Sequence, residues 1–248
     1  LDLGTNGEIV LATPERLLCC SCAAGPAFEG GHIKWGLRGA PGAVDQVSVS
    51  ADSLVPELRV IGDGPALGIC GSGLVSLVSE LVKIGAVTPS GGFDPARRCK
   101  HLREGTDGWE YLLAAKENTG TGQDLVLTHQ DLSHLQLAKA AIHAGISLLL
   151  AELGLARVEK VLLAGAFGNY LDPVAACGIN MFPGVSVENI TGVGNAAGAG
   201  AISALISRSQ RIRAQTIARR MDYLELATHP KFNETFVMSM PFSEHGDD

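Results

Sequence analysis

The sequence predicts an α/β protein in which a mixed β-sheet carries helices on both faces. Short apolar strands, glycine-rich loops and helices follow one another at four places, after Leu3, around Gly71, after Leu163 and around Gly194. A hydrophobic content of 46% and 31 glycines among 248 residues suit a sizeable core joined by many tight turns. In an open α/β sheet, ligands bind where such loops gather at the carboxyl ends of the strands. The four loops are therefore the first candidates for a functional site.

Three short strands are predicted at the start, at Leu1–Leu3, Glu8–Ala12 and about Arg16–Cys20. The first two are joined by Gly4-Thr5-Asn6-Gly7, and Asn-Gly between apolar runs predicts a tight hairpin with positive φ at both positions. The glycines would let backbone N–H groups face outward and cradle phosphate oxygens, while Asp2 holds a hydrated Mg²⁺. An ordinary turn explains the same residues, so the loop alone leaves both interpretations open.

Six cysteines are present, and three of them, Cys19, Cys20 and Cys22, lie close together at the third strand. Alternation along a strand places Cys20 and Cys22 on one face and Cys19 on the other. Packing of small buried side chains is favoured over metal ligation, because free cysteine is among the most buried residue types. No signal peptide precedes the cysteines, so we expect a reduced, cytoplasmic protein.

Charge and hydropathy argue against two broad classes of partner. A net charge of −7 argues against a nucleic-acid binder, which would present a basic surface. The most apolar stretch, Ile142–Leu153, is about half as long as a membrane span and contains His143 and Glu152. We therefore expect neither nucleic acid nor a membrane as a partner.

Residues at about 32–124 are expected to form an inserted subdomain. Within it, Gly68–Gly73 leads into an apolar helix at Leu74–Ile84 that is followed by a glycine. Ser72 is predicted as the N-cap of this helix, and an anion bound at the glycine-flanked helix start is the alternative. The later part, 88–124, is polar and glycine-rich, and we expect it to contain a small surface hairpin.

The clearest helix begins with Thr128-His129-Gln130-Asp131, which fits a capping box. Apolar residues then recur at steps of three and four up to Leu153, which predicts one buried face, and Gly154 ends the helix. Lys139 lies inside this helix, and spacing alone lets its side chain face either a bound nucleotide or solvent.

The last third of the chain repeats the pattern of strand, glycine loop and helix. A β-rich run at Val158–Leu163 predicts a buried strand that leads into a loop at 164–169. Asp172-Pro173 predicts the start of a short helix. A further strand is predicted at Val185–Ile190, ahead of the loop at 191–195.

Two helices and a tail follow. The Ala/Gly-rich helix at Ala196–Ser207 is predicted to pack tightly against a neighbouring element or a ligand, because it has few side-chain atoms. The arginines of the next helix are expected to form a solvated face. The tail is expected to supply an edge strand.

Several established motifs do not occur. No loop fits G-x-G-x-x-G with a ribose-binding acid, none fits G-x-x-x-x-G-K-[ST], and Gly71-Ser72-Gly73 is too short for a G-x-S-x-G elbow. The histidines lie on unrelated segments without metal-ligand spacing. No residue is therefore assigned a catalytic role.

The order of the loops resembles that of an actin-like ATPase, the ribonuclease-H-like superfamily of sugar kinases, heat-shock chaperones and actin. In these proteins an acidic hairpin grips phosphate, a later glycine loop contacts adenosine, and a small-residue helix connects the two halves. Here residues 2–7 resemble the phosphate hairpin, residues 162–168 the adenosine loop and residues 194–200 the connecting helix.

A closer resemblance is to the C-terminal part of the reductive activators of corrinoid proteins. It rests on six motifs in order, at Leu1–Leu11, Ala23–Gly30, Gly68–Leu74, Gln136–Ile142, Leu163–Gly168 and Val193–Ala197. Members of that family join a plant-type [2Fe–2S] ferredoxin domain to an actin-like ATPase domain. The resemblance implies the use of ATP to drive electron transfer to a Co(II) corrinoid protein, which returns to the Co(I) state.

The resemblance also implies a set of residues that would bind ATP and Mg²⁺. The phosphates and a Mg²⁺-bound water would be contacted by Asp2, Gly4, Thr5, Asn6 and Gly7, with Asp2 facing the metal through that water. Adenine and ribose would be bordered by Gly165, Ala166, Phe167 and Gly168, with Gly194 and Asn195 nearby.

Two features of the family are not found in this sequence. The ferredoxin pattern C-x₄-C-x₂-C is missing, and so is the earlier Asp-Ile-Gly-Thr-Thr hairpin that begins the first actin-like half. We therefore expect residues 1–248 to be the second half of the actin-like domain, a cut piece that is not active alone. The [2Fe–2S] cluster is expected only in an N-terminal domain outside this chain.

The expected partners are a corrinoid protein and a second copy of the chain in a homodimer. Two other functions remain open at this stage. A small-molecule kinase of the same superfamily would need a catalytic base, for which Glu8 and Glu29 are the candidates. A non-catalytic docking or dimerisation module would use the Ala/Gly-rich helix and the arginine-bearing helix as interfaces.

Overall fold

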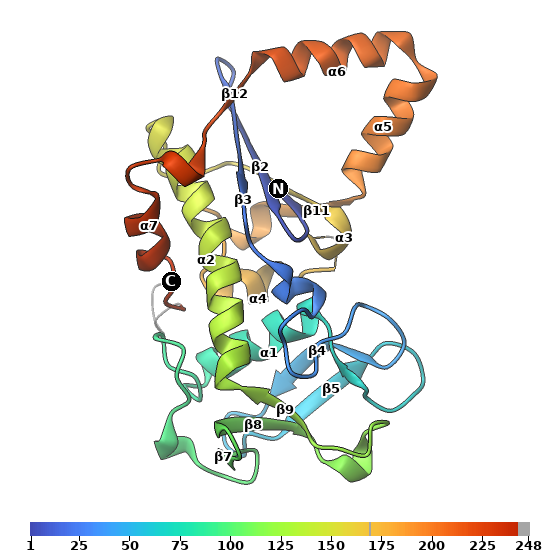
Figure 1. Ribbon diagram of the computed structural model, residues 1–248, viewed down its shortest axis with the longest axis vertical. Coiled ribbons are helices and arrows are strands. Elements are labelled where there is room, and N and C mark those ends of the chain that lie inside the picture. The colour runs from blue at the N-terminus through green and yellow to red at the C-terminus, as the bar shows by residue number, and fades with distance from the viewer. Residues whose placement is uncertain (169, 243–248) are drawn as a thin grey trace.

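The computed structural model describes residues 1–168 and 170–242, and its largest sheet has six strands (Figure 1). The strand order is β11-β10-β1-β2-β3-β12. The bounds are β1 Asp2–Leu3, β2 Gly7–Ala12, β3 Leu17–Cys22, β10 Val161–Ala164, β11 Ile190–Gly194 and β12 Met221–Tyr223. Because β1 pairs in parallel with β10 and antiparallel with β2, the predicted mixed sheet is confirmed.

A helix covers one face of this sheet in the described part of the chain. Helix α2 (His129–Glu152) packs on β2 and β3, and Ile9 points at Gly145 of α2, where no side chain stands in the way. The opposite face carries Val10 and Leu162, which are 48% and 47% exposed. The prediction of helices on both faces thus holds for one face only, because the helices that connect β11 to β12 project away from the sheet (Figure 1).

The other end of the molecule holds two three-stranded sheets and helix α1 (Gly71–Lys83). One sheet has the order β5-β4-β6 and the other β7-β8-β9. Their strands are β4 Ala43–Val49, β5 Pro56–Val60, β6 Gly68–Ile69, β7 Leu102–Gly105, β8 Gly108–Ala114 and β9 Leu125–Thr128. The expected surface hairpin is formed by β7 and β8.

Helix α1 begins earlier than its sequence predicts. Its N-cap is Cys70, while Ser72 lies inside the first turn, so the prediction of Ser72 as the N-cap is wrong. The apolar surroundings explain the difference, because Ser72 is buried and its hydroxyl contacts the Cys70 thiol at 3.3 Å. The predicted C-terminal glycine is confirmed, since Gly85 has φ 70° after the helix end.

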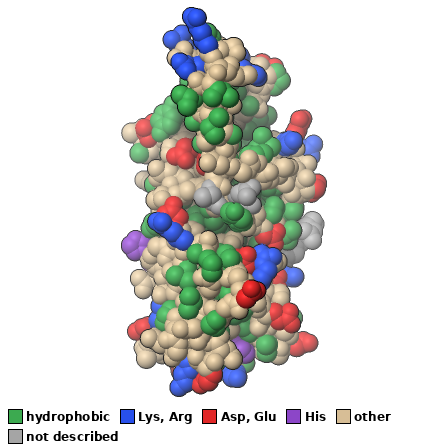
Figure 2. Space-filling model, turned by 90° about the vertical axis from the view of Figure 1, so that its right-hand side faces the viewer, with side chains coloured by type: hydrophobic (Ala, Val, Ile, Leu, Met, Phe, Trp, Pro, Cys, Tyr) green, Lys and Arg blue, Asp and Glu red, His purple; other side chains and the backbone are tan. Residues whose placement is uncertain are grey.

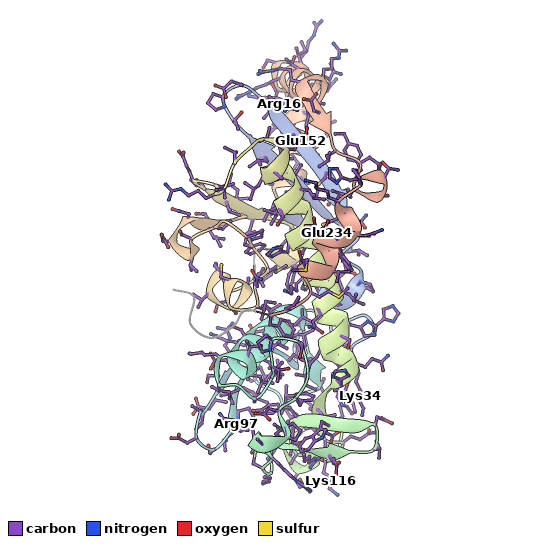
Figure 3. All side chains as sticks on the ribbon, turned by 90° about the vertical axis from the view of Figure 1, so that its left-hand side faces the viewer. Arg16, Lys34, Arg97, Lys116, Glu152 and Glu234 are labelled. Atoms are coloured by element: carbon purple, nitrogen blue, oxygen red, sulfur yellow. The ribbon has the colours of Figure 1, made fainter. Side chains whose placement is uncertain are left out.

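Helix α2 joins the two ends of the molecule. The predicted capping box is confirmed: the Thr128 hydroxyl accepts from the Asp131 amide, and the Asp131 carboxylate accepts from the Thr128 amide at 2.8 Å. Figure 3 shows α2 running from Glu152, towards the end of the molecule that carries Arg16 in the turn between β2 and β3, to Lys34 at the smaller sheets. One hydrophobic core surrounds the helix and links Leu3, Ile142 and Leu77.

By length and composition alone, α2 could cross a membrane, which the short apolar stretch in the sequence did not suggest. Two thirds of its most apolar window is buried inside the protein, however. The helix is therefore accounted for as the core helix of the fold.

After β10 the chain forms α3 (Gly165–Gly168) and α4 (Pro173–Gly178), and Asp172 caps α4 as predicted. The predicted strand at Val185–Ile190 is wrong, because residues Val187–Asn189 form a 3-10 helix and the strand begins only at Ile190. Asn169, at the end of the predicted glycine loop, lies outside the described residues. The remaining 3-10 helices are Pro26–Glu29, Pro95–Arg97, Lys116–Asn118 and Leu226–Thr228.

Two helices, α5 (Ala196–Ile206) and α6 (Arg208–Arg220), leave the sheet after β11 and return to it at β12. We call residues 196–220 the arm; no residue in it is buried. Within this chain the Ala/Gly-rich helix does not pack tightly against a neighbouring element, whereas packing against a ligand stays a prediction; the exposed arginine helix is confirmed. The tail supplies the edge strand β12 and then helix α7 (Phe232–Met238), which packs on α2.

Candidate functional site

Three of the predicted loops meet at one edge of the large sheet. Asp2 pairs with Ala164, and Ala164 pairs with Gly194, so the ends of β1, β10 and β11 lie side by side. The hairpin after β1, helix α3 after β10 and the turn after β11 therefore leave the sheet together. This is the edge at which open α/β sheets bind ligands, because the carboxyl ends of the parallel strands meet there.

The hairpin differs in detail from the predicted Asn-Gly turn. Leu3 pairs with Gly7, which leaves Gly4–Asn6 as the loop, and neither Asn6 nor Gly7 has positive φ. The Gly4 amide donates to the Asn6 carbonyl at 2.9 Å, so it does not face outward as predicted. Gly7 is buried, since a Cβ there would lie 2.7 Å from the Cys22 sulfur. Packing against Cys22 therefore accounts for this glycine.

The tip of the hairpin carries the free donors. Among the described residues, the backbone N–H groups of Thr5 and Asn6 donate to no acceptor, and both residues are exposed. Adjacent outward N–H groups in a tight loop are the usual donors to phosphate oxygens. The hairpin therefore fits an anion at Thr5 and Asn6 rather than at its glycines.

Helix α3 begins where only glycine fits. Gly165 has φ 90°, and a Cβ there would lie 2.7 Å from the Leu3 carbonyl and closer still to an Asp2 carboxylate oxygen. The Asp2 side chain thus lies against the start of α3, half-buried between the two loops. Its position between the hairpin and α3 fits the predicted contact with a metal-bound water.

A third wall comes from the 3-10 helix Pro26–Glu29, which the sequence indicated only as a small-residue segment. The Gly25 amide donates to the Thr5 carbonyl at 3.0 Å, and the Thr5 hydroxyl donates to the Glu29 carboxylate at 2.6 Å. The Phe28 ring stacks on the Phe167 ring with centroids 4.5 Å apart. The ring predicted to border adenosine is therefore buried and ties α3 to this wall.

The start of α1 closes against the same wall. A Cβ at Gly71 would collide with the Phe28 carbonyl and lie 2.9 Å from the Phe167 ring. The loop around Gly71 was among the first candidates, but Phe28 was missed as a site residue. The signal for it was the abundance of glycine and alanine at 23–31, which permits close approach of backbones.

The turn after β11 has a structural role in this chain. Gly194 has φ 67°, and the Asn195 side chain caps α5 by accepting from the Gly198 amide at 2.7 Å. Gly194 pairs with Ala164, the residue directly before α3, so the end of β11 lies beside α3.

Lys139 is not part of the site. Its side chain is buried, donates to the Pro241 carbonyl and lies 5.6 Å from the centre of the Phe242 ring. Burial lowers the pKa of Lys139 to about 7. Both predicted orientations, toward a nucleotide or toward solvent, are wrong because the C-terminal tail covers this side of α2.

Two of the three clustered cysteines are buried as predicted. Cys20 and Cys22 are buried while Cys19 is partly exposed, and burial raises the pKa of the Cys22 thiol to about 11. No group of three or more His, Cys, Asp or Glu side chains suited to a metal occurs in the described residues. The burial of Cys20 and Cys22 fits the predicted packing.

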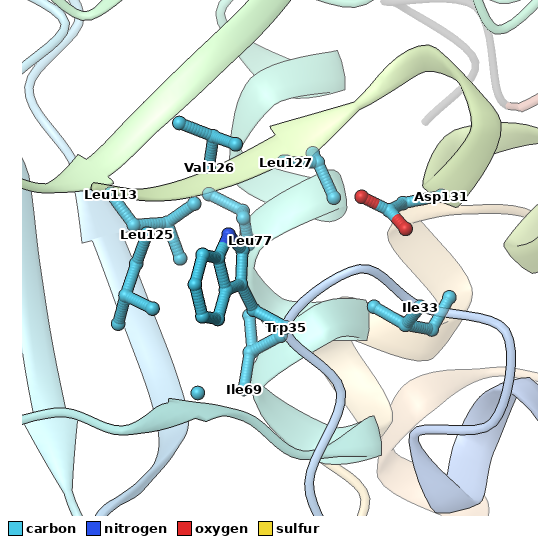
Figure 4. A pocket seen from close by; sticks show the side chains of 10 residues that line it. Ile33, Trp35, Ile69, Leu77, Leu113, Leu125, Val126, Leu127 and Asp131 are labelled. Atoms are coloured by element: carbon cyan, nitrogen blue, oxygen red, sulfur yellow. The ribbon is translucent and has the colours of Figure 1, made fainter. Parts of the chain in front are cut away.

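Two cavities lie away from the loops. One, of about 10 Å³, is enclosed between Trp35, Leu77 and Leu125 and has room for about one water molecule (Figure 4). A wider groove of about 430 Å³ runs between β5 and β8, near Pro56, Leu58 and His101. Neither is lined by the residues predicted to bind the nucleotide.

Known proteins resemble this chain over its whole length. The chain is 34% identical over 255 residues to "Corrinoid activation enzyme RamQ" of Eubacterium limosum and 25% identical over 269 residues to "[Co(II) methylated amine-specific corrinoid protein] reductase" of Methanosarcina barkeri. Each match covers 99% of this chain but only 42% and 46% of those proteins. The chain thus spans less than half the length of these relatives.

A solved structure, "Reductive activator for corrinoid,iron-sulfur protein", matches with a TM-score of 0.89 and 39% identity, over 99% of this chain and 39% of that one. The family model described as the C-terminal domain of RACo, the ASKHA domain, matches residues 1–248. The chain has an actin-like fold and belongs to the family of C-terminal ASKHA domains of RACo.

Proposed function

We propose that this chain is the nucleotide-binding second half of an ATP-dependent reductive activator, which returns Co(II) corrinoid proteins to Co(I). The observation that carries the proposal is the meeting of three loops at one sheet edge, with free N–H groups at Thr5 and Asn6 and the Asp2 carboxylate beside them. The names of the relatives support a corrinoid protein as the partner. The [2Fe–2S] cluster is then expected in another domain of the same cytoplasmic protein.

The residues at the sheet edge fit Mg-ATP by their chemistry. The Thr5 and Asn6 amides would bind phosphate oxygens, and Asp2 would accept a hydrogen bond from a Mg²⁺-bound water. The adenosine would lie along Gly165, Ala166, Phe167 and Gly168, with Gly194 and Asn195 nearby. Magnesium would neutralise the phosphate charge. ATP held between this chain and a first actin-like half would favour the closed arrangement of the halves.

Calorimetric titration of Mg-ATP into the complete gene product and into this chain tests the nucleotide site. We expect saturable binding by the complete gene product, and at least about tenfold weaker binding after Asp2→Ala, because a charge-assisted hydrogen bond is removed. Absorbance of an added corrinoid protein then reports Co(I) formation. No binding by the complete gene product would refute the proposal, and phosphate transfer to a sugar or carboxylate would favour the kinase.

The arm supports a second proposal, that the protein is a homodimer. An apolar helix such as α5 is normally buried, yet Leu205 and Ile206 are 76% and 79% exposed. The following helix carries five arginines and no acidic residue, on a chain with a net charge of −7. Figure 2 shows the Lys and Arg side chains gathered at the tip of the molecule, above hydrophobic ones. Such an arm complements the rest of a second copy, which is acidic and leaves one face of its large sheet exposed.

Sedimentation of the complete gene product tests the dimer. We expect Leu205→Glu combined with Ile206→Glu to shift a dimer to a monomer, because the change places two charges in the proposed apolar contact. Val174→Glu is the control, since Val174 of α4 is also exposed but lies outside the arm. A wild-type monomer, or a dimer unaffected by the arm substitutions, would refute the proposal.

A further inference from the structure

The contact between Thr5 and Glu29 determines what the Thr5 hydroxyl can bind. The hydroxyl donates to the Glu29 carboxylate at 2.6 Å, a length typical of a strong O–H···O⁻ bond. A threonine hydroxyl has one proton and two lone pairs. Once its proton is held by Glu29, the Thr5 oxygen can only accept hydrogen bonds.

The acceptors that the hairpin and its neighbours present match a particular kind of ligand. The Thr5 oxygen, the second oxygen of exposed Glu29 and the Asp2 carboxylate all require donors. Phosphate oxygens are acceptors too, so these groups repel them. Water bound to Mg²⁺ presents only its protons, and it satisfies such acceptors. The Thr5 and Asn6 amides, by contrast, are donors that suit phosphate.

From this geometry we infer that Glu29 is a positioning residue for the metal: it holds the Thr5 proton, and thereby makes Thr5 an acceptor for a water molecule on the nucleotide-bound Mg²⁺. The inference rests on the proposed binding of Mg-ATP. Glu29 is not needed merely to hold the hairpin in place. The Gly25 amide already ties the hairpin to the same wall, because it donates to the Thr5 carbonyl.

In this arrangement Glu29 and Thr5 determine how much Mg²⁺ increases the affinity for ATP. Glu29→Leu removes the carboxylate and frees the Thr5 proton for a phosphate oxygen. We expect Glu29→Leu to weaken binding of Mg-ATP about tenfold or more, the effect of losing one charge-assisted hydrogen bond. Binding of ATP in excess EDTA should stay equal or become tighter. Thr5→Val should weaken Mg-ATP to a similar extent, and Thr5→Ser should restore it.

The experiment is calorimetric titration of the complete gene product with ATP, once with Mg²⁺ and once with EDTA. Glu57→Leu is the matched control, because exposed Glu57 of β5 also accepts from a hydroxyl, that of Ser48 at 3.4 Å, in another sheet. Thermal unfolding of each variant shows that it is folded, and the near-isosteric Thr5→Val carries the test if Glu29→Leu unfolds.

The outcomes separate the inference from the function on which it rests. The measured quantity is the affinity for Mg-ATP divided by the affinity for metal-free ATP. The inference is supported if this ratio falls in Glu29→Leu and Thr5→Val but not in Glu57→Leu. An unchanged ratio overturns the inference. If the affinity for ATP falls equally with and without Mg²⁺, the role of Glu29 is only to hold the hairpin in place. If the wild-type protein binds no ATP under either condition, the proposed function fails and the inference with it.

Discussion

Replacement of Gly165 by alanine tests the geometry on which the site depends. At φ 90° an L-residue is strained by roughly 1–2 kcal/mol. The added Cβ would also lie 2.7 Å from the Leu3 carbonyl and closer to Asp2, and such overpacking typically costs about 1–3 kcal/mol. We therefore expect Gly165→Ala to lower the free energy of unfolding by about 2–5 kcal/mol, a large share of the roughly 5–15 kcal/mol of a typical domain.

A second glycine separates the two contributions. Gly154 follows α2 with φ 66°, and a Cβ there would meet nothing within 4 Å. Gly154→Ala should therefore show only the backbone strain, about 1–2 kcal/mol. The difference between the two variants measures the collision of the new Cβ with Leu3 and Asp2.

Urea unfolding followed by circular dichroism provides the measurement, and the three proteins should share one slope against denaturant if only the native state changes. The reasoning is refuted if Gly165→Ala loses no more stability than Gly154→Ala. In that case the close approach of α3 to β1, which brings the two loops of the candidate site together, would not exist in solution.

Two further predictions concern α2. Burial lowers the pKa of Lys139 to about 7 in the folded protein, whereas an exposed lysine in the unfolded chain titrates at about 10.5. Between these two pH values the unfolded chain holds one more proton than the folded protein. The free energy of unfolding of the wild type should therefore rise with pH in this range, by up to about 1.4 kcal/mol per pH unit. Lys139→Met should remove this rise, and parallel pH profiles of the two proteins would contradict it. Thr128→Ala removes the N-cap of α2 and should lower the free energy of unfolding by about 1 kcal/mol. Ser133→Ala is the control, because the exposed Ser133 hydroxyl bonds only the His129 carbonyl within the same helix. It should change the free energy of unfolding by less than about 0.5 kcal/mol. Equal urea midpoints for these two alanine variants would show that the cap contributes no stability.

Local chemistry accounts for the elements that were predicted well. The capping box at Thr128 and the Asp172-Pro173 helix start involve residues within a few positions of one another, so sequence spacing determines them. The same holds for the glycine that ends α1. The predicted N-cap at Ser72 failed because burial of the helix start, a tertiary effect, outweighed the capping preference of serine.

The candidate site was predicted in part. The sequence order of strands and glycine loops indicated that the hairpin, α3 and the Gly194 turn belong together. It also led to Gly4 as an outward phosphate donor, which the structure contradicts because that amide bonds within the loop. The free donors at Thr5 and Asn6 depend on how the loop closes, and the residue types alone do not specify this.

The sequence by itself determined the mixed α/β class, the starts of α2 and α4 and the family resemblance, because these depend on patterns within short segments. Only the tertiary structure decided which distant groups meet. Thr5 bonds Glu29, 24 positions away, and Lys139 bonds Pro241, 102 positions away. It also decided that α5 is exposed and one sheet face open. Such outcomes depend on strand order and on how the segments pack, and side-chain periodicity along one segment does not encode them.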